Sequence, residues 1–198
     1  MSKDDQLFEI ADSQQGYFTA KQAEECGFYA SHFSRYVSSG RWIKEQRGIY
    51  RLAHYSVTER PELVLWMLWS RSKGGAIQGT WSHETALDIY ELSDVMPAKM
   101  HMTVPMGFRK SVPIPKLLVL HRAELSASEI RVQQGYRVTT PLRTLQDILA
   151  EGSLSREFVV QAIQEALQRG LVSRQDLKKH SDPEVSKEFT RLIDDYHL

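Results

Sequence analysis

Residues 16–52 read GYFTAKQAEECGFYASHFSRYVSSGRWIKEQRGIYRL, and this stretch decides the fold of the first part of the chain. Thr19 is placed to cap a helix over residues 20–26, with Gln22 where a capping box requires it. Gly27 ends that helix, and a third helix is expected over residues 30–39, stopped by Gly40. Together with a first helix expected over residues 4–13, this order predicts a helix-turn-helix, whose last helix enters the major groove of DNA.

A β-hairpin is expected directly after the third helix. Within residues 41–52, two short β-prone runs flank a polar tip that ends in Gly48. Trp42, Tyr50 and Leu52 are expected to pack on the helices. Since a hairpin in this position is a wing, residues 1–54 are predicted to form a winged helix-turn-helix DNA-binding domain.

The third helix and the hairpin carry the residues that are expected to contact DNA. Spacing places Phe33, Tyr36 and Val37 on the inward helix face, whereas the opposite face is polar. On that polar face, Arg35 has the length to reach guanine or phosphate. The predicted contact residues are Ser31, His32, Ser34, Arg35, Ser38, Arg41, Lys44, Arg47 and Arg51. The alternative is an ordinary solvated surface.

Charge is distributed unevenly along the chain. The 198 residues include 25 basic and 25 acidic side chains, and a net charge of zero by itself argues against nucleic-acid binding. However, residues 1–29 carry two basic and six acidic side chains, whereas residues 30–52 carry five basic side chains and one acidic one. The second segment is the compact basic patch that phosphate binding requires. On charge alone, a solvated surface stays an equal alternative.

Residues 61–198 are predicted to form an α+β domain after a polar connection at residues 53–60. Helices are expected over residues 61–72 and 84–92 and from Pro141 onward, with strands over residues 99–104, 117–121 and 136–139. Further helices are expected over residues 155–169, from Ser173 and over residues 183–196. This order implies a mixed α+β domain with a small antiparallel sheet and C-terminal helices.

The pattern resembles the AbiEi family of antitoxins from bacterial type IV toxin–antitoxin systems. In the winged helix, the resemblance rests on GYFT at residues 16–19, Gly27, SR at 34–35, GR at 40–41 and RGIYRL at 47–52. The blocks SHETALDIYEL, KMHMTVP, LVLHR and GYRVTTPLRTLQDIL resemble those that follow the wing in longer members. One departure is Tyr29, which stands where a short polar helix cap is usual. Tyr29 therefore either contacts DNA or packs inward.

The resemblance implies an antitoxin that represses its own operon and uses residues 61–198 to counter a toxin with a nucleotidyltransferase-like fold. Two copies are expected on an inverted-repeat operator in double-stranded DNA, because one winged helix buries little surface for tight specific binding. The alternative is a stand-alone transcription factor whose second domain senses a ligand or dimerises.

No catalytic residue, cofactor or metal site is predicted. His83-Glu84 lacks the second histidine of a zincin helix, and the chain has no Gly-rich phosphate loop. Some relatives carry a nuclease-like domain, but the predicted strands lack its acidic residue and its Glu-x-Lys. His101 and His121 are expected to be ordinary strand histidines; each could approach Asp94 or Glu124, but no ligand spacing links them.

Two further expectations concern location and partners. The longest apolar run, residues 63–69, is far shorter than a membrane span, and the acidic N-terminus lacks a signal-peptide pattern. A single cysteine, Cys26, excludes an internal disulfide and fits a reducing cytoplasm. Arg143 and Asp147 lie four residues apart on one predicted helix, where they form either a stabilising ion pair or a partner-binding surface.

Overall fold

The chain divides into two compact units. The computed structural model describes residues 1–56, 58–179 and 182–198. The first unit comprises Met1–Gly79 and Val132–Tyr136, and the second comprises Thr80–Arg131 and Arg137–Leu198. Val57, in the predicted connection, and residues 180 and 181 lie outside the described residues. No helix among the described residues combines the length and the apolar character that crossing a membrane requires.

The first unit contains the predicted helical segments. Helix α1 spans Lys3–Ser13 and α2 spans Ala20–Glu25, and Thr19 caps α2 in the predicted capping box with Gln22. The third segment is a 3-10 turn, η1 (Ala30–His32), followed by α3 (Phe33–Ser38). Tyr29 offers no side-chain cap to η1. The third helix is therefore shorter than residues 30–39.

The predicted hairpin belongs to a three-stranded sheet. It consists of β2 (Trp42–Gln46) and β3 (Ile49–Leu52), and β3 also pairs with β1 (Tyr17–Thr19). All pairings are antiparallel, and the strand order is β1-β3-β2. Strand β1 was not predicted, because three residues directly before a helix cap are too few to show an alternating pattern.

Trp42 lies at the centre of an aromatic cluster that packs the wing on the helices. Its side chain is 2% exposed, and its ring centroid lies 4.6 to 5.8 Å from those of five other rings, those of Phe18, Phe28, Phe33, Tyr36 and Tyr50. We call these six residues the Trp42 cluster. Because its members come from β1, α3, β2, β3 and the turn after α2, the cluster fixes the wing against the helix-turn-helix.

The first unit extends beyond residues 1–54. Helix α4 (Pro61–Trp69) packs against β1 and β3, although the sequence analysis assigned it to the second domain. The Gln134 amide donates to the carbonyl of Asp12 at 2.9 Å. A Cβ on Gly135 would lie 2.9 Å from Val64, so this backbone, with φ +85°, packs tightly on α4. The compact units therefore do not coincide with residues 1–54 and 61–198.

The second unit is built on a mixed five-stranded sheet, in the order β6-β5-β4-β8-β7. The strands of this sheet are β4 (Thr80–Trp81), β5 (Met100–Val104), β6 (Leu118–Arg122), β7 (Ile130–Gln133) and β8 (Tyr136–Thr139). Of β7 and β8, the second unit contains residues 130–131 and 137–139. The α+β class is confirmed, but the expectation of an antiparallel sheet is wrong. Strands β5 and β6 run parallel, as do β4 and β8, while β4 and β5 are antiparallel. Residues 105–117 supply the connection of about a dozen residues that parallel neighbours need.

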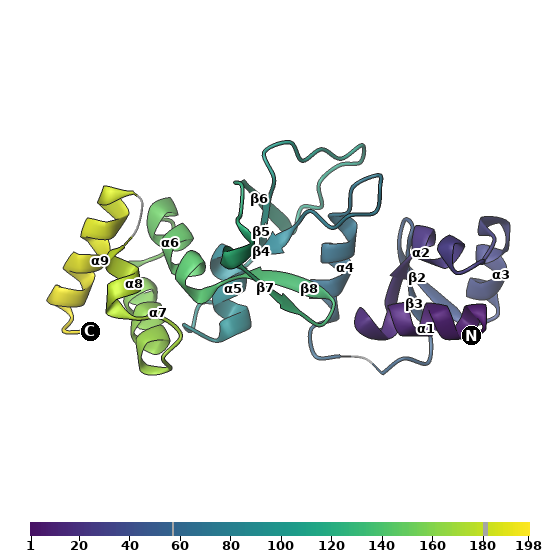
Figure 1. Cartoon of the computed structure of the whole chain (residues 1–198), viewed down its shortest axis with the longest axis horizontal. Coiled ribbons are helices and arrows are strands. Elements are labelled where there is room, and N and C mark those ends of the chain that lie inside the picture. The colour runs from purple at the N-terminus through teal and green to yellow at the C-terminus, as the bar shows by residue number, and fades with distance from the viewer. Residues whose placement is uncertain (57, 180–181) are drawn as a thin grey trace. The chain divides into compact units, whose positions relative to one another are not determined.

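Helices form the remainder of the second unit, which also contains the 3-10 turn η2 (Ala127–Glu129). They are α5 (His83–Tyr90), α6 (Pro141–Glu151), α7 (Arg156–Gln168), α8 (Arg174–Lys178) and α9 (Pro183–Asp195). Helix α5 packs on β5 and α6, and Figure 1 shows α6 to α9 side by side. Their apolar faces share one buried cluster that includes Leu145, Ile163 and Phe189. The C-terminal end of α6 lies near the start of α5, because Glu151 approaches His83 there.

Replacing Trp42 with alanine should destabilise the protein by about 3–5 kcal/mol, because it leaves a cavity among five rings. Urea denaturation followed by circular dichroism measures this change. The matched control is Ile43→Ala on the same strand, where the side chain is 36% exposed and the expected cost is smaller. Equal costs for the two variants would contradict a central role for the Trp42 cluster.

Candidate nucleic-acid interface

Eight of the nine predicted DNA contacts are exposed on the first unit. They come from the 3-10 turn, the third helix and the wing: Ser31, His32, Ser34, Arg35, Ser38, Arg41, Lys44 and Arg47. Phe33 is buried in the Trp42 cluster, while Tyr36 and Val37 are half-buried against that core. The two predicted faces of the third helical segment are therefore present, one packed inward and one facing solvent.

A shallow cleft of about 380 Å³ is lined by both helical and wing residues: His32, Arg35, Tyr36, Ser39 and Arg41. The Arg41 guanidinium lies 5.1 Å from the centre of the Tyr36 ring and donates to Asp4 at 2.6 Å. Both partners of this ion pair are about half exposed, so the pair contributes little stability. A phosphate group can therefore compete with Asp4 for Arg41.

Three cations on this surface are not engaged by acidic groups. Across residues 1–56, 58–179 and 182–198, no ion pair involves Arg35, Lys44 or Arg47. The adjacent acidic side chains are instead paired elsewhere, with Asp4 on Arg41 and Glu45 on Arg51. The positive charge of these three residues is therefore open to an external anion.

Arg51, which was predicted to contact DNA, is mostly buried in the structure. Its guanidinium Nε donates to Glu45 at 2.9 Å, and the two side chains are only 17% and 24% exposed. Residues 45 and 51 lie on the same face of the β2–β3 hairpin. Arg51 therefore neutralises Glu45 and stabilises the wing, and its side chain is not presented to solvent as a phosphate contact.

Tyr29 does not pack inward. It is 72% exposed, and its ring centroid lies 6.0 Å from that of His32. Of the two alternatives that the sequence left open, inward packing is excluded. Tyr29 adds an aromatic side chain to the exposed surface beside His32.

Arg143 and Asp147 form an ion pair and not an exposed surface. Arg143 Nε donates to Asp147 Oδ1 at 2.7 Å, with the side chains 19% and 10% exposed. The same guanidinium also bonds Glu129. Burial raises the pKa of Asp147, and the charge of Arg143 opposes this rise. The predicted alternative of a stabilising ion pair is the one that this geometry favours.

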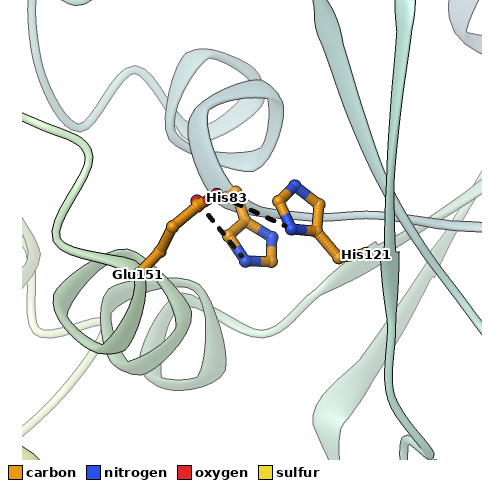
Figure 2. A group of neighbouring side chains, drawn as sticks. All are labelled: His83, His121 and Glu151. Atoms are coloured by element: carbon orange, nitrogen blue, oxygen red, sulfur yellow. Dashed lines mark ion pairs between the residues drawn. The ribbon is translucent and has the colours of Figure 1, made fainter.

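A histidine cluster in the second unit was not predicted from the sequence. His83, from the start of α5, and His121, on β6, converge on Glu151 at the end of α6 (Figure 2). His101 Nδ1 lies 3.1 Å from His121 Nε2. Asp94 instead bonds Gln161, and Glu124 accepts the backbone N–H of Met106. The parallel register, with Thr103 opposite His121, puts His101 and His121 on one sheet face; the chain order alone did not reveal this pairing.

Burial dominates the electrostatics of this cluster. It lowers the pKa of His83 to about 3, with the neighbouring His121, His101 and Arg143 acting in the same direction. Burial also lowers the pKa of His101 and of His121, while Glu151 opposes both shifts. The rings of His83 and His121 stack with centroids 3.5 Å apart. At neutral pH these imidazoles are therefore uncharged.

The protein should lose stability on acidification through His83. An unfolded chain binds a proton on this residue near pH 6.5, whereas the folded chain does so only near pH 3. The contribution is thus complete above pH 6.5 and falls as the pH approaches 3, by up to about 2 kcal/mol between pH 6.5 and pH 5. Urea denaturation in buffer containing EDTA measures it. His83→Asn should flatten the pH dependence, and an unchanged slope would contradict the assignment.

Comparison with known proteins finds a similarity to one family in part of the chain. A family model described as "Transcriptional regulator, AbiEi antitoxin" matches residues 5–53. A search of curated proteins found no match. Among solved structures, the RV2827C protein from Mycobacterium tuberculosis is similar with 12% identity and a TM-score of 0.45, over 96% of this chain and 81% of that one. We infer nothing about fold or function from a similarity at this TM-score.

The matched residues run from α1 to the end of the wing, and they include the Trp42 cluster and the exposed basic surface. The resemblance was predicted for this segment and for the blocks that follow the wing, and the match covers the first of these two parts. Residues 5–53 therefore match the model of a family of transcriptional regulators, the AbiEi antitoxins.

Proposed function

We propose that this protein is an antitoxin and transcriptional repressor that binds operator DNA through η1, α3 and the wing. The observation that carries the proposal is the set of cations at Arg35, Lys44 and Arg47, which no described acidic side chain pairs, within a segment matched by a regulator family. Cations free of internal pairing gain most from phosphate, because binding releases the counterions of DNA without breaking an ion pair.

The geometry supports a division of roles on DNA. Arg35 lies on the exposed face of α3, where it is suited to read guanine in the major groove. Lys44 and Arg47 lie on the wing, where they are suited to contact the phosphate backbone. Tyr29 and His32 extend the exposed surface at the N-terminal side of α3. Small side chains at Ser31, Ser34 and Ser38 allow a close approach to the groove.

Two copies of the chain are proposed to occupy an inverted repeat. One helix and one wing contact few base pairs, and regulators of this size obtain affinity by presenting two symmetric modules to half-sites. The first unit supplies one such module for each chain.

The second unit is proposed to counter a cognate toxin with a nucleotidyltransferase-like fold, without catalysing a reaction itself. This part of the proposal rests on the resemblance of residues 80–150 to the blocks that follow the wing in longer AbiEi proteins. Direct contact between the two proteins is one way to achieve it. A stand-alone transcription factor is the alternative, and a toxin gene directly downstream distinguishes the two.

Alanine at Arg35 should relax the sequence preference of operator binding, because a bidentate contact to a base contributes discrimination. Alanine at Lys44 or at Arg47 should weaken binding about equally for all sequences and lower the salt slope by roughly one unit each. Fluorescence anisotropy with operator and scrambled duplexes, across a series of salt concentrations, measures both effects.

The matched control for this experiment is Lys73→Ala, which removes an exposed lysine of the first unit outside the interface. It should leave both affinity and salt slope unchanged. If Arg35, Lys44 and Arg47 variants all bind as the Lys73 variant does, the interface has been placed on the wrong surface.

Toxin antagonism should survive the combined substitution of Arg35, Lys44 and Arg47 by alanine. All three lie on the first unit and are exposed, so the fold of the second unit is unaffected. Growth rescue during co-expression with the toxin, together with reporter repression, measures the two activities. The experiment uses the full chain, because truncation at residue 60 would remove the contacts of α4 with β1 and β3.

The expected result is lost repression with intact growth rescue. A variant of the second unit, Trp81→Ala, serves as the converse control because Trp81, on strand β4, is fully buried. It should lose growth rescue. If the triple variant loses rescue while remaining folded, neutralisation depends on the first unit.

A further inference from the structure

Three potential metal ligands face one another in the second unit. His83 Nε2 lies 3.8 Å from one carboxylate oxygen of Glu151, and His121 Nδ1 lies 3.8 Å from the other. The three ligand atoms all lie within 4.8 Å of one another. Figure 2 shows that they come from three separate elements, α5, β6 and α6. The separations exceed hydrogen-bond length, so the polar atoms surround a gap.

We propose that His83, His121 and Glu151 bind one Zn²⁺ ion. Two imidazole nitrogens and one carboxylate oxygen are a ligand set that zinc accepts, with a water in the fourth position. Zinc–ligand bonds of about 2.0–2.1 Å in a tetrahedron place the ligands about 3.3 Å apart. The His83 and His121 rings stack with an interplanar angle of 12°, so at least one ring must rotate before both lone pairs point at one ion. Mg²⁺ and Ca²⁺ prefer all-oxygen ligands and do not suit this set.

A chain of side chains behind the ligands holds the imidazoles in the required tautomers. If His121 Nε2 carries its hydrogen, it donates to His101 Nδ1 at 3.1 Å, and His101 Nε2–H then points to Glu84 at 3.7 Å. This arrangement leaves a lone pair on His121 Nδ1, the nitrogen that lies 3.8 Å from Glu151. The opposite tautomers would set a lone pair of His101 against the Glu84 carboxyl group.

A hydrogen-bond partner can also fix the tautomer of His83. Its Nδ1 lies 2.9 Å from Ser82 Oγ, which also accepts from the Thr103 hydroxyl. When Nδ1–H donates to Ser82, the lone pair of Nε2 faces Glu151. Partners of this kind orient metal-bound histidines in proteins and raise their basicity.

The backbone of His83 is strained. Its φ is +52°, in the left-handed region that side chains with a Cβ rarely adopt. Glycine or asparagine would adopt this conformation at a lower cost. Strained residues of this kind concentrate at functional sites, where the surrounding structure holds them in place. Metal binding by the imidazole would offset the free-energy cost of this backbone conformation.

A buried carboxylate oxygen points to a missing partner in the same cleft. The cleft measures about 330 Å³ and is lined by His83, His121, Asp147 and Glu151. Asp147 Oδ2 is buried and has no hydrogen-bond partner among the described residues, and the side chain is only 10% exposed. A water on the metal would supply a donor for such an oxygen.

The charges around the cluster permit a divalent cation. Arg143 is held by Glu129 and Asp147, and Arg122 is held by the carbonyls of Met106 and Phe108. The adjoining carboxyl groups outnumber the adjoining cations: Glu84, Glu129, Asp147 and Glu151 against Lys99, Arg122 and Arg143. Because the site links α5, β6 and α6, metal binding would stabilise the second unit independently of DNA binding.

The test is a Zn²⁺ titration of the untagged, EDTA-stripped full chain by calorimetry, together with thermal unfolding. We expect one equivalent of Zn²⁺ to bind in the micromolar range or more tightly and to raise the Tm, whereas Mg²⁺ leaves it unchanged. Glu151→Gln and His83→Asn should abolish this binding. His101→Gln removes only the supporting side chain and should weaken the affinity about tenfold to hundredfold.

The matched control is His197→Asn, because His197 is an exposed histidine with the same left-handed backbone, φ +54°. It should bind Zn²⁺ as the natural chain does. His83→Asn also relieves strain, so it should fold and be at least as stable without metal as the natural chain. The proposal is overturned if the natural chain shows no saturable binding, or if folded Glu151→Gln and His83→Asn bind as His197→Asn does.

Discussion

The packing of five aromatic rings around Trp42 is the interaction on which the first unit depends. Three short helical segments of this length would not be stable alone, because most helical stability in proteins comes from tertiary packing. Trp42 supplies that packing from the first residue of β2, while Phe33 and Tyr36 supply it from α3. The same contacts set the direction of the opposite face of α3 and of the wing. Packing of the Trp42 cluster therefore determines where Arg35, Lys44 and Arg47 are exposed.

Charge is arranged so that a neutral chain still presents a basic surface. The acidic side chains nearest to the interface are occupied: Asp4 bonds Arg41, and Glu45 bonds Arg51. These pairs leave Arg35, Lys44 and Arg47 without an acidic partner among the described residues. Net charge is therefore a poor guide to partners here, because affinity for a polyanion follows the local field. The second unit follows a different design, in which histidines and carboxyl groups face one another inside a cleft.

Local patterns in the sequence predicted the first unit well and the second unit less well. The capping box at Thr19, the glycine turns and the hairpin around Gly48 are short-range signals, and each was found where it was predicted. Strands β1 and β4 were missed because two or three residues carry no periodicity, and the four-residue strand β7 was missed as well. The mixed pairing of the sheet and the convergence of His83, His121 and Glu151 depend on contacts between distant segments, which spacing in one sequence does not encode. The ion pair of Arg51 with Glu45 could not be predicted without knowing the strand register of the wing.

Recognition of an operator is proposed for η1, α3 and the wing. Hydroxyl-radical footprinting of the promoter that precedes the gene, with the full chain, tests it most directly. We expect two protected half-sites in an inverted repeat, centred about one helical turn or a multiple of it apart and filled cooperatively. Protection that is uniform along the DNA, or confined to a single half-site, would contradict recognition by a pair of winged helices.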